Sequence, residues 1–470
     1  MPVDADTLVK LRMELETLFE SARVNAQSWL DQAGLPLTTT TNRTIVEPNE
    51  EGNGWGSRQV RIEQNILAAE RDFFQLWRLE AGLVTNEWLA RAYELAGRLL
   101  PLFAATMPSP APFAPTGGDL IGRDLADVDP SDPALKLMWQ FVVAPARWYL
   151  RRLPSVDVRA LEIAQGIANE VLFILANGEF LVRQLVPLDG LKMRDKLEYG
   201  SCRVRALSPI ERGEFVEWTH GVASSVLAPL ALAGKWVVPE FLLEVDTVYR
   251  DPATFHMIPT PPLVMALELH GVPVAGPGTV TRQVIPEWFG FGRSTSPIPM
   301  QGSLGVKALE MTAEGFATAC RTAELLATFS LEDPQQTAEL ALRRFRLGCG
   351  RDDPRDAVID FVIALEGLLL PYDDSTRRTE MGYRFRMHGA HFIASNPLER
   401  PALHCQLRDL YDIRSRLVHG GGRHPTHADL VEAARKARGL AARGLLKAVS
   451  EGFPNAEYFR RALLGVARQP

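Results

Sequence analysis

The stretch that decides the fold of the C-terminal part is residues 403–422, LHCQLRDLYDIRSRLVHGGG. Its apolar side chains recur at helical spacing. They form one stripe, made of Leu403, Leu407, Leu410, Tyr411, Leu417 and Val418. Three glycines follow, and glycine reaches the left-handed conformation that closes a helix. The sequence therefore predicts an amphipathic helix that stops at residue 419.

Two side chains near the end of this predicted helix suggest a chemical role. Arg414 falls in the middle of the apolar stripe, where a guanidinium is costly unless it is paired or lines a cavity. His419 is the last residue before the glycines, at the negative end of the helix dipole, which favours the imidazolium form. Together they suit phosphodiester chemistry, as anion clamp and proton donor. A favourable helix cap and an ordinary ion pair remain the alternative interpretation.

A second helix is predicted over residues 354–370, and it is apolar on two faces. Such a helix lies in a core or in a subunit interface. Glu366 sits within one of these faces and needs a partner, for which Arg414 or Arg384 would serve. A buried structural ion pair is the simplest role for Glu366.

Three blocks now resemble a known family. LRRFRLGC at 342–349, DAVIDFVIALEGLLL at 356–370 and LYDIRSRLVHGG at 410–421 are similar, in order and spacing, to the ApeA-like branch of the HEPN domains. The segment RSRLVH, 414–419, resembles the HEPN signature, in which an arginine precedes a histidine by four to six residues. The clear resemblance spans about 335–465, and a fainter one spans 180–330.

The resemblance implies a bundle of four or five helices that dimerises and often cleaves RNA without a metal. Bacterial members are frequently toxins or antiviral effectors. Carried over by position, Arg414 would bind the scissile phosphate and His419 would move the proton. Ser415 occupies a position where many HEPN ribonucleases have Asn, Asp or His, but serine can still donate a hydrogen bond to a phosphate oxygen. The residues expected to support the site are Glu366, Arg384, Tyr411 and Arg416.

Helical geometry bears on the expected dimer. Residues five apart on one helix point about 140° apart. A site that joins Arg414 and His419 is therefore easier to build from two chains than within one.

Composition and charge set broad limits. The chain has 470 residues, 46% hydrophobic and 23% charged, which suits two or three globular domains. Its net charge of −6 argues against a protein that coats nucleic acid along its whole length. Residues 335–470 hold 22 Lys and Arg against 16 Asp and Glu, a net of +6, whereas the remainder has a net of −12. The basic C-terminal part favours a polyanionic partner.

Upstream patterns predict the remaining organisation. The predicted regions are a helical region 1–106 with a loop at 38–57, a proline-rich linker 107–118, a helical segment 119–178, a mixed α+β domain 179–330 and a HEPN-like helical domain 335–470. Within the α+β domain we expect strands at 180–186, 202–207, 236–245 and 264–269 and a helix at 210–232. The predicted fold class is mainly α with an α+β middle region and a C-terminal HEPN bundle.

Several common classes lack their motifs here. We find no P-loop, no dinucleotide fingerprint, no His-Glu-x-x-His and no Gly-x-Ser-x-Gly. The four cysteines form no Cys-x-x-Cys pair, which suits reduced thiols in a cytoplasm better than a zinc site. Neither a signal peptide nor a membrane span is expected. We therefore expect a cytoplasmic protein with no cofactor and no metal.

The preferred hypothesis is a homodimeric HEPN endoribonuclease that cuts RNA without metal, as an antiphage or toxin-like effector. Its acidic front part would respond to a phage-derived or nucleotide trigger. The alternative is a non-catalytic HEPN module that dimerises and binds RNA or nucleotide. A third possibility is an unrelated helical regulator.

Overall fold

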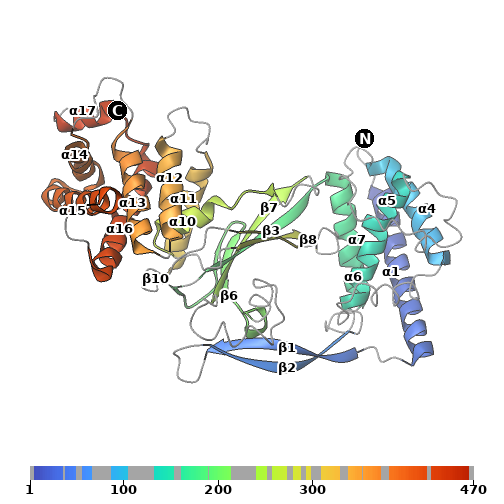
Figure 1. The fold of residues 1–470 in the computed structure, drawn as a ribbon. Helices are drawn as coiled ribbons and strands as arrows, with labels where there is room; N and C mark the ends of the chain where they lie inside the picture. The colour runs from blue at the N-terminus through green and yellow to red at the C-terminus, as the bar shows by residue number, and fades with distance from the viewer. Residues whose placement is uncertain are drawn as a thin grey trace.

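The chain folds into two sets of helices separated by an antiparallel sheet (Figure 1). The computed structural model describes residues 5–34, 38–48, 55–65, 86–103, 132–152, 160–188, 190–212, 240–250, 257–272, 279–286, 293–297, 309–328, 337–351, 353–371, 380–420 and 425–464. The linker predicted at 107–118 lies outside these residues.

The N-terminal helices share one apolar core. They are α1 (Ala5–Ala33), α4 (Asn86–Phe103), α5 (Pro133–Met138), the short π-helical segment η2 (Trp139–Val143), α6 (Ala144–Arg152) and α7 (Ala160–Asn177). Leu15 and Phe19 of α1 are fully buried, as the helical spacing in the sequence predicts. Asp132 begins α5 by accepting a hydrogen bond from the backbone N–H of Ala134, and the Tyr93 hydroxyl donates to the same carboxylate at 2.6 Å.

One prediction for this region is wrong. A hairpin of β1 (Thr38–Pro48) and β2 (Trp55–Asn65) replaces the loop expected at 38–57, and β2 continues to residue 65 in the region expected to be helical. The first strand is a run of threonines followed by isoleucine and valine, and β-branched side chains fit a pleated strand better than a helix. Region 1–106 is therefore helical only in part.

The middle of the chain forms a six-stranded sheet in the order β5-β6-β7-β3-β8-β9, antiparallel throughout. The strands are β3 (Phe180–Leu188), β5 (Leu197–Tyr199), β6 (Cys202–Ala206), β7 (Phe241–Tyr249), β8 (Thr279–Ile285) and β9 (Arg293–Pro297), with a separate pair of β4 (Leu191–Lys192) and β10 (Leu309–Glu310). The predicted fold class, mainly α with an α+β middle region, is confirmed at this level.

The sheet has one apolar and one charged face, because successive side chains of a strand alternate. On the charged face Arg183 faces Asp246 across β3 and β7, with Nε 2.7 Å from Oδ1. Glu244 is buried and pairs with both Arg203 and Arg205 of β6. The acidic residues of β7 are thus neutralised by arginines from both neighbouring strands.

The strand expected at 264–269 is a helix, α10 (Pro262–Leu269). Its side chains are buried on nearly all sides, and a short apolar run does not distinguish a buried helix from a buried strand. Pro262 at the first helical turn is the signal that favours the helix. Of the helix predicted at 210–232, residues 210–212 are helical and the rest lies outside the described residues.

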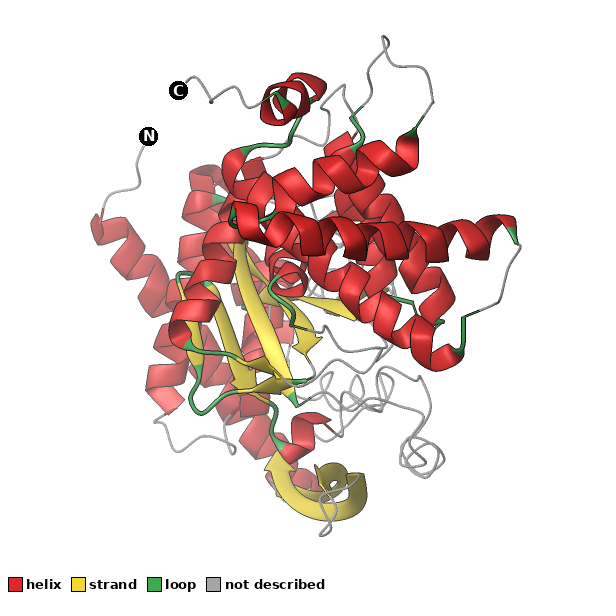
Figure 2. Ribbon diagram, turned by 90° about the vertical axis from the view of Figure 1, so that its left-hand side faces the viewer, coloured by secondary structure: helices red, strands yellow, loops and turns green. Residues whose placement is uncertain are grey.

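The C-terminal helices surround α13. They are α11 (Ala313–Thr328), α12 (Thr337–Cys349), α13 (Pro354–Leu369), α14 (Met381–Ile393), α15 (Arg400–His419), α16 (His427–Glu451) and α17 (Ala456–Leu463), with a short 3-10 turn, η6 (Pro397–Glu399). Helix α13 contacts α12, α14, α15 and α16, which explains why it is apolar on two faces. Figure 2 shows these helices beside the strands of the sheet.

Gly389 allows α14 to approach its neighbours closely. A β-carbon there would lie 2.4 Å from Leu407 Cδ1 and 2.9 Å from Leu369 Cδ1, both in buried side chains. Gly389→Ala should therefore lower the free energy of unfolding by about 1–3 kcal/mol. Gly439, in the exposed interior of α16, has nothing within 4 Å of such a carbon. Gly439→Ala should raise the free energy of unfolding by about 0.5–1 kcal/mol.

Urea unfolding followed by circular dichroism measures both glycine variants. Shifts in opposite directions are expected. An unchanged or raised free energy of unfolding in Gly389→Ala would show that close packing does not limit the side chain at that position.

Candidate functional site

Arg414 and Glu366 meet between α15 and α13. Arg414 Nη2 lies 3.5 Å from Glu366 Oε2, and each side chain is 21% exposed. Of the two partners expected for Glu366, the structure places Arg414 against it. Arg414 and Glu366 are 48 positions apart in the sequence, and each interrupts an apolar helix face. The structure pairs their opposite charges.

The pair is loose. Burial raises the pKa of Glu366, and the positive charge of Arg414 opposes that rise without cancelling it. Arg414 Nε is buried, and no described residue accepts a hydrogen bond from it. A guanidinium has five N–H donors, so a single contact at 3.5 Å leaves most of its hydrogen-bonding capacity unused. The ion pair between Arg414 and Glu366 is therefore a single, long contact.

His419 and Ser415 lie on the exposed end of α15. His419 is exposed and is the last residue of the helix. Gly420 closes the helix with φ 70°, and its N–H donates to the carbonyl of Arg416 at 3.0 Å. Ser415 is half-buried. Arg414 contacts α13, whereas His419 is exposed at the end of the helix.

Tyr411 connects α15 to the first turn of α14. A β-carbon at Gly382 would lie 3.1 Å from Tyr411 Cε1, and the ring of Phe385 lies 5.4 Å from that of Tyr411. Residues 412–419 therefore extend roughly 12 Å along α15 beyond this contact. Arg384, half-buried on α14, lies two residues from Gly382. Tyr411 thus packs against α14, whereas none of these contacts involves Arg384.

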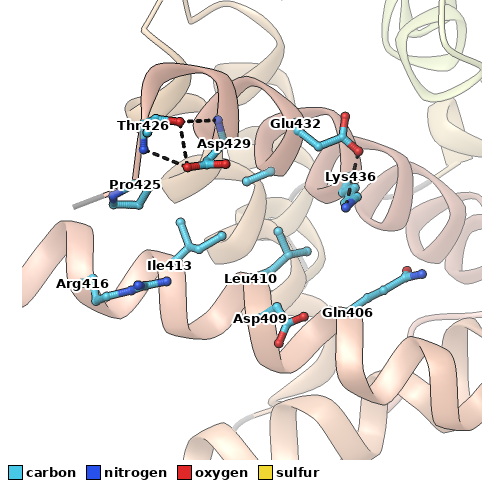
Figure 3. A pocket seen from close by; sticks show the side chains of 11 residues that line it. Gln406, Asp409, Leu410, Ile413, Arg416, Pro425, Thr426, Asp429, Glu432 and Lys436 are labelled. Carbon is cyan, nitrogen blue, oxygen red and sulfur yellow. Dashed lines mark hydrogen bonds and ion pairs between the residues drawn. The ribbon is translucent and has the colours of Figure 1, made fainter. Parts of the chain in front are cut away.

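Arg416 is directed elsewhere. Its side chain lines a groove of about 540 Å³ between α15 and the start of α16 (Figure 3). The groove is lined by Gln406, Asp409, Leu410, Ile413, Arg416, Pro425, Thr426, Asp429, Glu432, Ala433 and Lys436. Its charges are mixed, and Lys436 Nζ lies 3.4 Å from Glu432. The structure does not group Arg416 with Arg414, although the sequence predicts both for one site.

Sequence reasoning missed three exposed apolar side chains on α14 and α15. Met381 and Tyr383 of α14 are 45% and 50% exposed, and Val418 of α15 is 48% exposed. The sequence places Val418 on the apolar stripe of its helix. Helical spacing alone does not show which part of that stripe other helices cover.

His388 is a buried histidine that sequence reasoning also missed. Its Nδ1 lies 2.7 Å from the carbonyl of Leu369, and its ring stacks on Phe459 at 4.0 Å. Burial lowers its pKa, and the positive charges of Arg384 and His391 lower it further. Its place in a core, away from solvent, indicates a structural role.

His388 gives a testable pH dependence. Since its pKa is lower in the folded than in the unfolded state, its stabilising contribution is present above the unfolded pKa of about 6.5 and is lost as pH falls below that value. The midpoint temperature of thermal unfolding should therefore decrease as the pH is lowered from 7 to 5. His388→Phe, which keeps the stacking on Phe459, should make this decrease smaller. An unchanged decrease in the variant would show that other groups cause it.

None of the described helices is long and apolar enough to span a bilayer. The described residues contain no group of three or more His, Cys, Asp and Glu side chains arranged to hold a metal ion.

Comparisons with protein-family models, curated proteins and solved structures find no match to this chain.

Proposed function

We propose that the protein is a metal-independent endoribonuclease of the HEPN type, acting as a homodimer and serving as an antiphage or toxin-like effector. One observation carries the proposal: Arg414 holds unused donors beside a loosely paired Glu366, five residues before an exposed histidine at the end of the helix. The resemblance of the three sequence blocks supplies the reaction class.

The residues suit transfer of the phosphodiester to the neighbouring 2′-hydroxyl. Arg414 binds the non-bridging oxygens, where negative charge grows as the bond from phosphorus to the 2′-oxygen forms. His419 protonates the 5′-oxygen that leaves, and the 2′-hydroxyl proton passes to solvent. The products are a 2′,3′-cyclic phosphate and a free 5′-hydroxyl. The Ser415 hydroxyl can donate one further hydrogen bond to the phosphate.

A second copy of the chain completes the proposed site. The exposed apolar side chains Met381 and Tyr383 of α14 and Val418 of α15 are residues that a two-fold partner would cover. Pairing the ends of two α15 helices brings the Arg414 of one chain toward the His419 of the other. The C-terminal helices then form the HEPN dimer, and the acidic front part of the chain is left to receive a trigger.

The alternative function is a non-catalytic HEPN module that dimerises and binds RNA or nucleotide. The contact between Arg414 and Glu366 favours it, since it gives Arg414 a structural role. In this case RNA binds without turnover, and His419→Ala changes nothing.

The full-length protein tests both functions. It is incubated with labelled single-stranded RNA and tRNA in EDTA, alongside His419→Ala and the control His427→Ala, which removes an exposed histidine at the start of α16. Wild type and the control should produce fragments that end in a cyclic phosphate, and His419→Ala should not. Binding without fragments, unchanged in all three proteins, would favour the alternative.

Expression in a bacterial host extends the same comparison. Wild type should halt growth and fragment total RNA, whereas His419→Ala should do neither. If uninfected cells are unaffected, the comparison is repeated under phage challenge. Intact RNA in infected cells as well would contradict the ribonuclease proposal.

A further inference from the structure

A hollow of about 480 Å³ lies between helix α7 and the strands β3, β7 and β8 of the sheet. The helix ends at Asn177 and β3 begins at Phe180, so a short turn joins these two elements, which lie beside each other in Figure 1. Ligand pockets in proteins typically have volumes of about 300–1,000 Å³. The hollow is therefore large enough for a small organic molecule.

Most of the surface of this hollow is apolar. Seven of the ten residues that line it have apolar side chains. Leu181 of β3 lies opposite Val248 of β7 and Ile285 of β8, so three strands contribute neighbouring apolar groups. Phe173 of α7 is 60% exposed and Val248 is 56% exposed, whereas Phe180 is buried. Covering the exposed side chains removes apolar surface from water, which favours binding of a molecule with an apolar body.

The charged residues that line the hollow are both acidic. Its three polar lining residues are Asn169, Glu170 and Glu179. Helix α7 has no lysine or arginine, and its charged residues are Glu162 and Glu170. Arg250 pairs with Glu179 at 2.6 Å, but the arginine side chain is 79% exposed and does not line the hollow. Exposed ion pairs of this kind are weak, so a cationic ligand can take the place of Arg250.

The aromatic rings of the hollow favour the same charge. A cation is attracted to the negative face of an aromatic ring within about 6 Å of the ring centre. Phe173 and Phe180 both line the hollow, one exposed on α7 and the other buried at the start of β3. Carboxylates attract a cation by charge, and more strongly where apolar groups exclude water.

We propose that this hollow binds a small organic cation, in which an ammonium group is attached to an aromatic or aliphatic body. The apolar body contacts the three strands, and the ammonium group faces Glu170 and Glu179 beside the ring of Phe173. An anion of the same shape meets two carboxylates and is rejected. The proposal rests on the hollow and does not depend on ribonuclease activity.

Three probes that share one apolar body and differ in charge test the proposal. Isothermal titration calorimetry measures the binding of 4-phenylbutylammonium, 4-phenylbutanol and 4-phenylbutyrate to the full-length protein at neutral pH. The cation should bind at one site per chain, at least about 10-fold more tightly than the anion, with the alcohol between them. Added salt should narrow this difference. Equal affinity for the three probes, or no binding of the cation, would overturn the proposal.

Two lysine substitutions locate the site. Val248→Lys places a positive charge in the hollow and should lower the affinity for the cation at least about 10-fold. Val24→Lys is the matched control, because Val24 of α1 is also 56% exposed and does not line the hollow. It should leave the affinity unchanged. An equal loss in both variants would show that the cation is attracted by the overall negative charge of the chain, and the proposal would then be wrong.

Two further variants separate apolar contact from charge. Phe173→Ala shortens an exposed side chain and should weaken the binding of all three probes. Glu179→Gln should weaken the binding of the cation and leave that of the alcohol unchanged. Circular dichroism checks that each variant is folded. An affinity for the cation that stays the same in both variants would contradict the proposed site.

Sedimentation velocity tests a second copy of the chain as the alternative occupant of the hollow. Without a probe, wild type, Val248→Lys and Val24→Lys should have the same oligomeric state. A wild-type dimer that Val248→Lys dissociates and Val24→Lys does not would assign this surface to a contact between subunits, and the proposal of a small cation would fail.

Discussion

Arg414→Ala is expected to lower the rate of RNA cleavage by at least about 100-fold. Preorganised donors aimed at developing negative charge typically contribute factors of this size. The residue holds unused donors, with Nε unpaired and Nη2 at 3.5 Å from Glu366. Measurement is by single-turnover cleavage of a labelled RNA in EDTA. A rate within a few-fold of wild type would contradict the proposed phosphate contact.

Arg414→Lys separates charge from geometry. Lysine keeps the positive charge beside Glu366 but lacks the planar fork that binds two phosphate oxygens. We expect a loss of cleavage of about 10-fold or more with the fold intact. If Arg414→Lys is as active as wild type, a point charge is sufficient and bidentate binding plays no part.

Loss of the ion pair must be distinguished from loss of the phosphate contact. Without Arg414, the pKa of Glu366, already raised by burial, should rise further. A carboxyl with a raised folded pKa stabilises the fold at low pH, and this contribution is lost as pH rises through that pKa. Because Glu366 can take up a proton and is partly exposed, the stability cost should be only about 1–2 kcal/mol. The double variant Arg414→Ala/Glu366→Gln should recover that stability but not the activity.

Residue patterns within one element were predicted well. The helix over 403–419 and its stop at Gly420 follow from apolar spacing and from the glycine itself. The contact of Arg414 with Glu366 was predictable for a different reason, since each interrupts an apolar face and so requires a polar partner. In both cases the physical cause lies in the local sequence.

Features that depend on packing between elements were not predicted. The direction of Arg416 depends on where α16 begins. The hairpin at 38–65 was missed for a related reason: mixed polar and β-branched residues give no clear periodicity until the partner strand is known.

Mixing two inactive variants is expected to restore cleavage. His419→Ala retains Arg414, and Arg414→Ala retains His419. If each site joins the arginine of one chain to the histidine of the other, a mixed dimer has one intact site and one site that lacks both residues. Random exchange makes about half of the dimers mixed, so the mixture should reach about a quarter of wild-type activity.

The expectation follows from the placement of the two residues in one chain. Arg414 contacts α13, whereas His419 is exposed at the end of α15, about 140° around the helix. The variants are unfolded and refolded together, or co-expressed with two different tags and purified through both. The double variant Arg414→Ala/His419→Ala mixed with wild type is the matched control. Its mixed dimers should have no intact site, because every site would lack either the arginine or the histidine.

The two mixtures distinguish a shared site from a site within one chain. For a site within one chain, the two single variants should give no activity together. The control mixture should then keep about half of wild-type activity, because each wild-type chain still works. For a shared site, both mixtures should show about a quarter of wild-type activity. The first mixture combines two inactive variants and so gains activity, whereas the second starts from active wild type and so loses it. An inactive first mixture with a half-active control would therefore contradict the composite site and leave the ribonuclease chemistry itself intact.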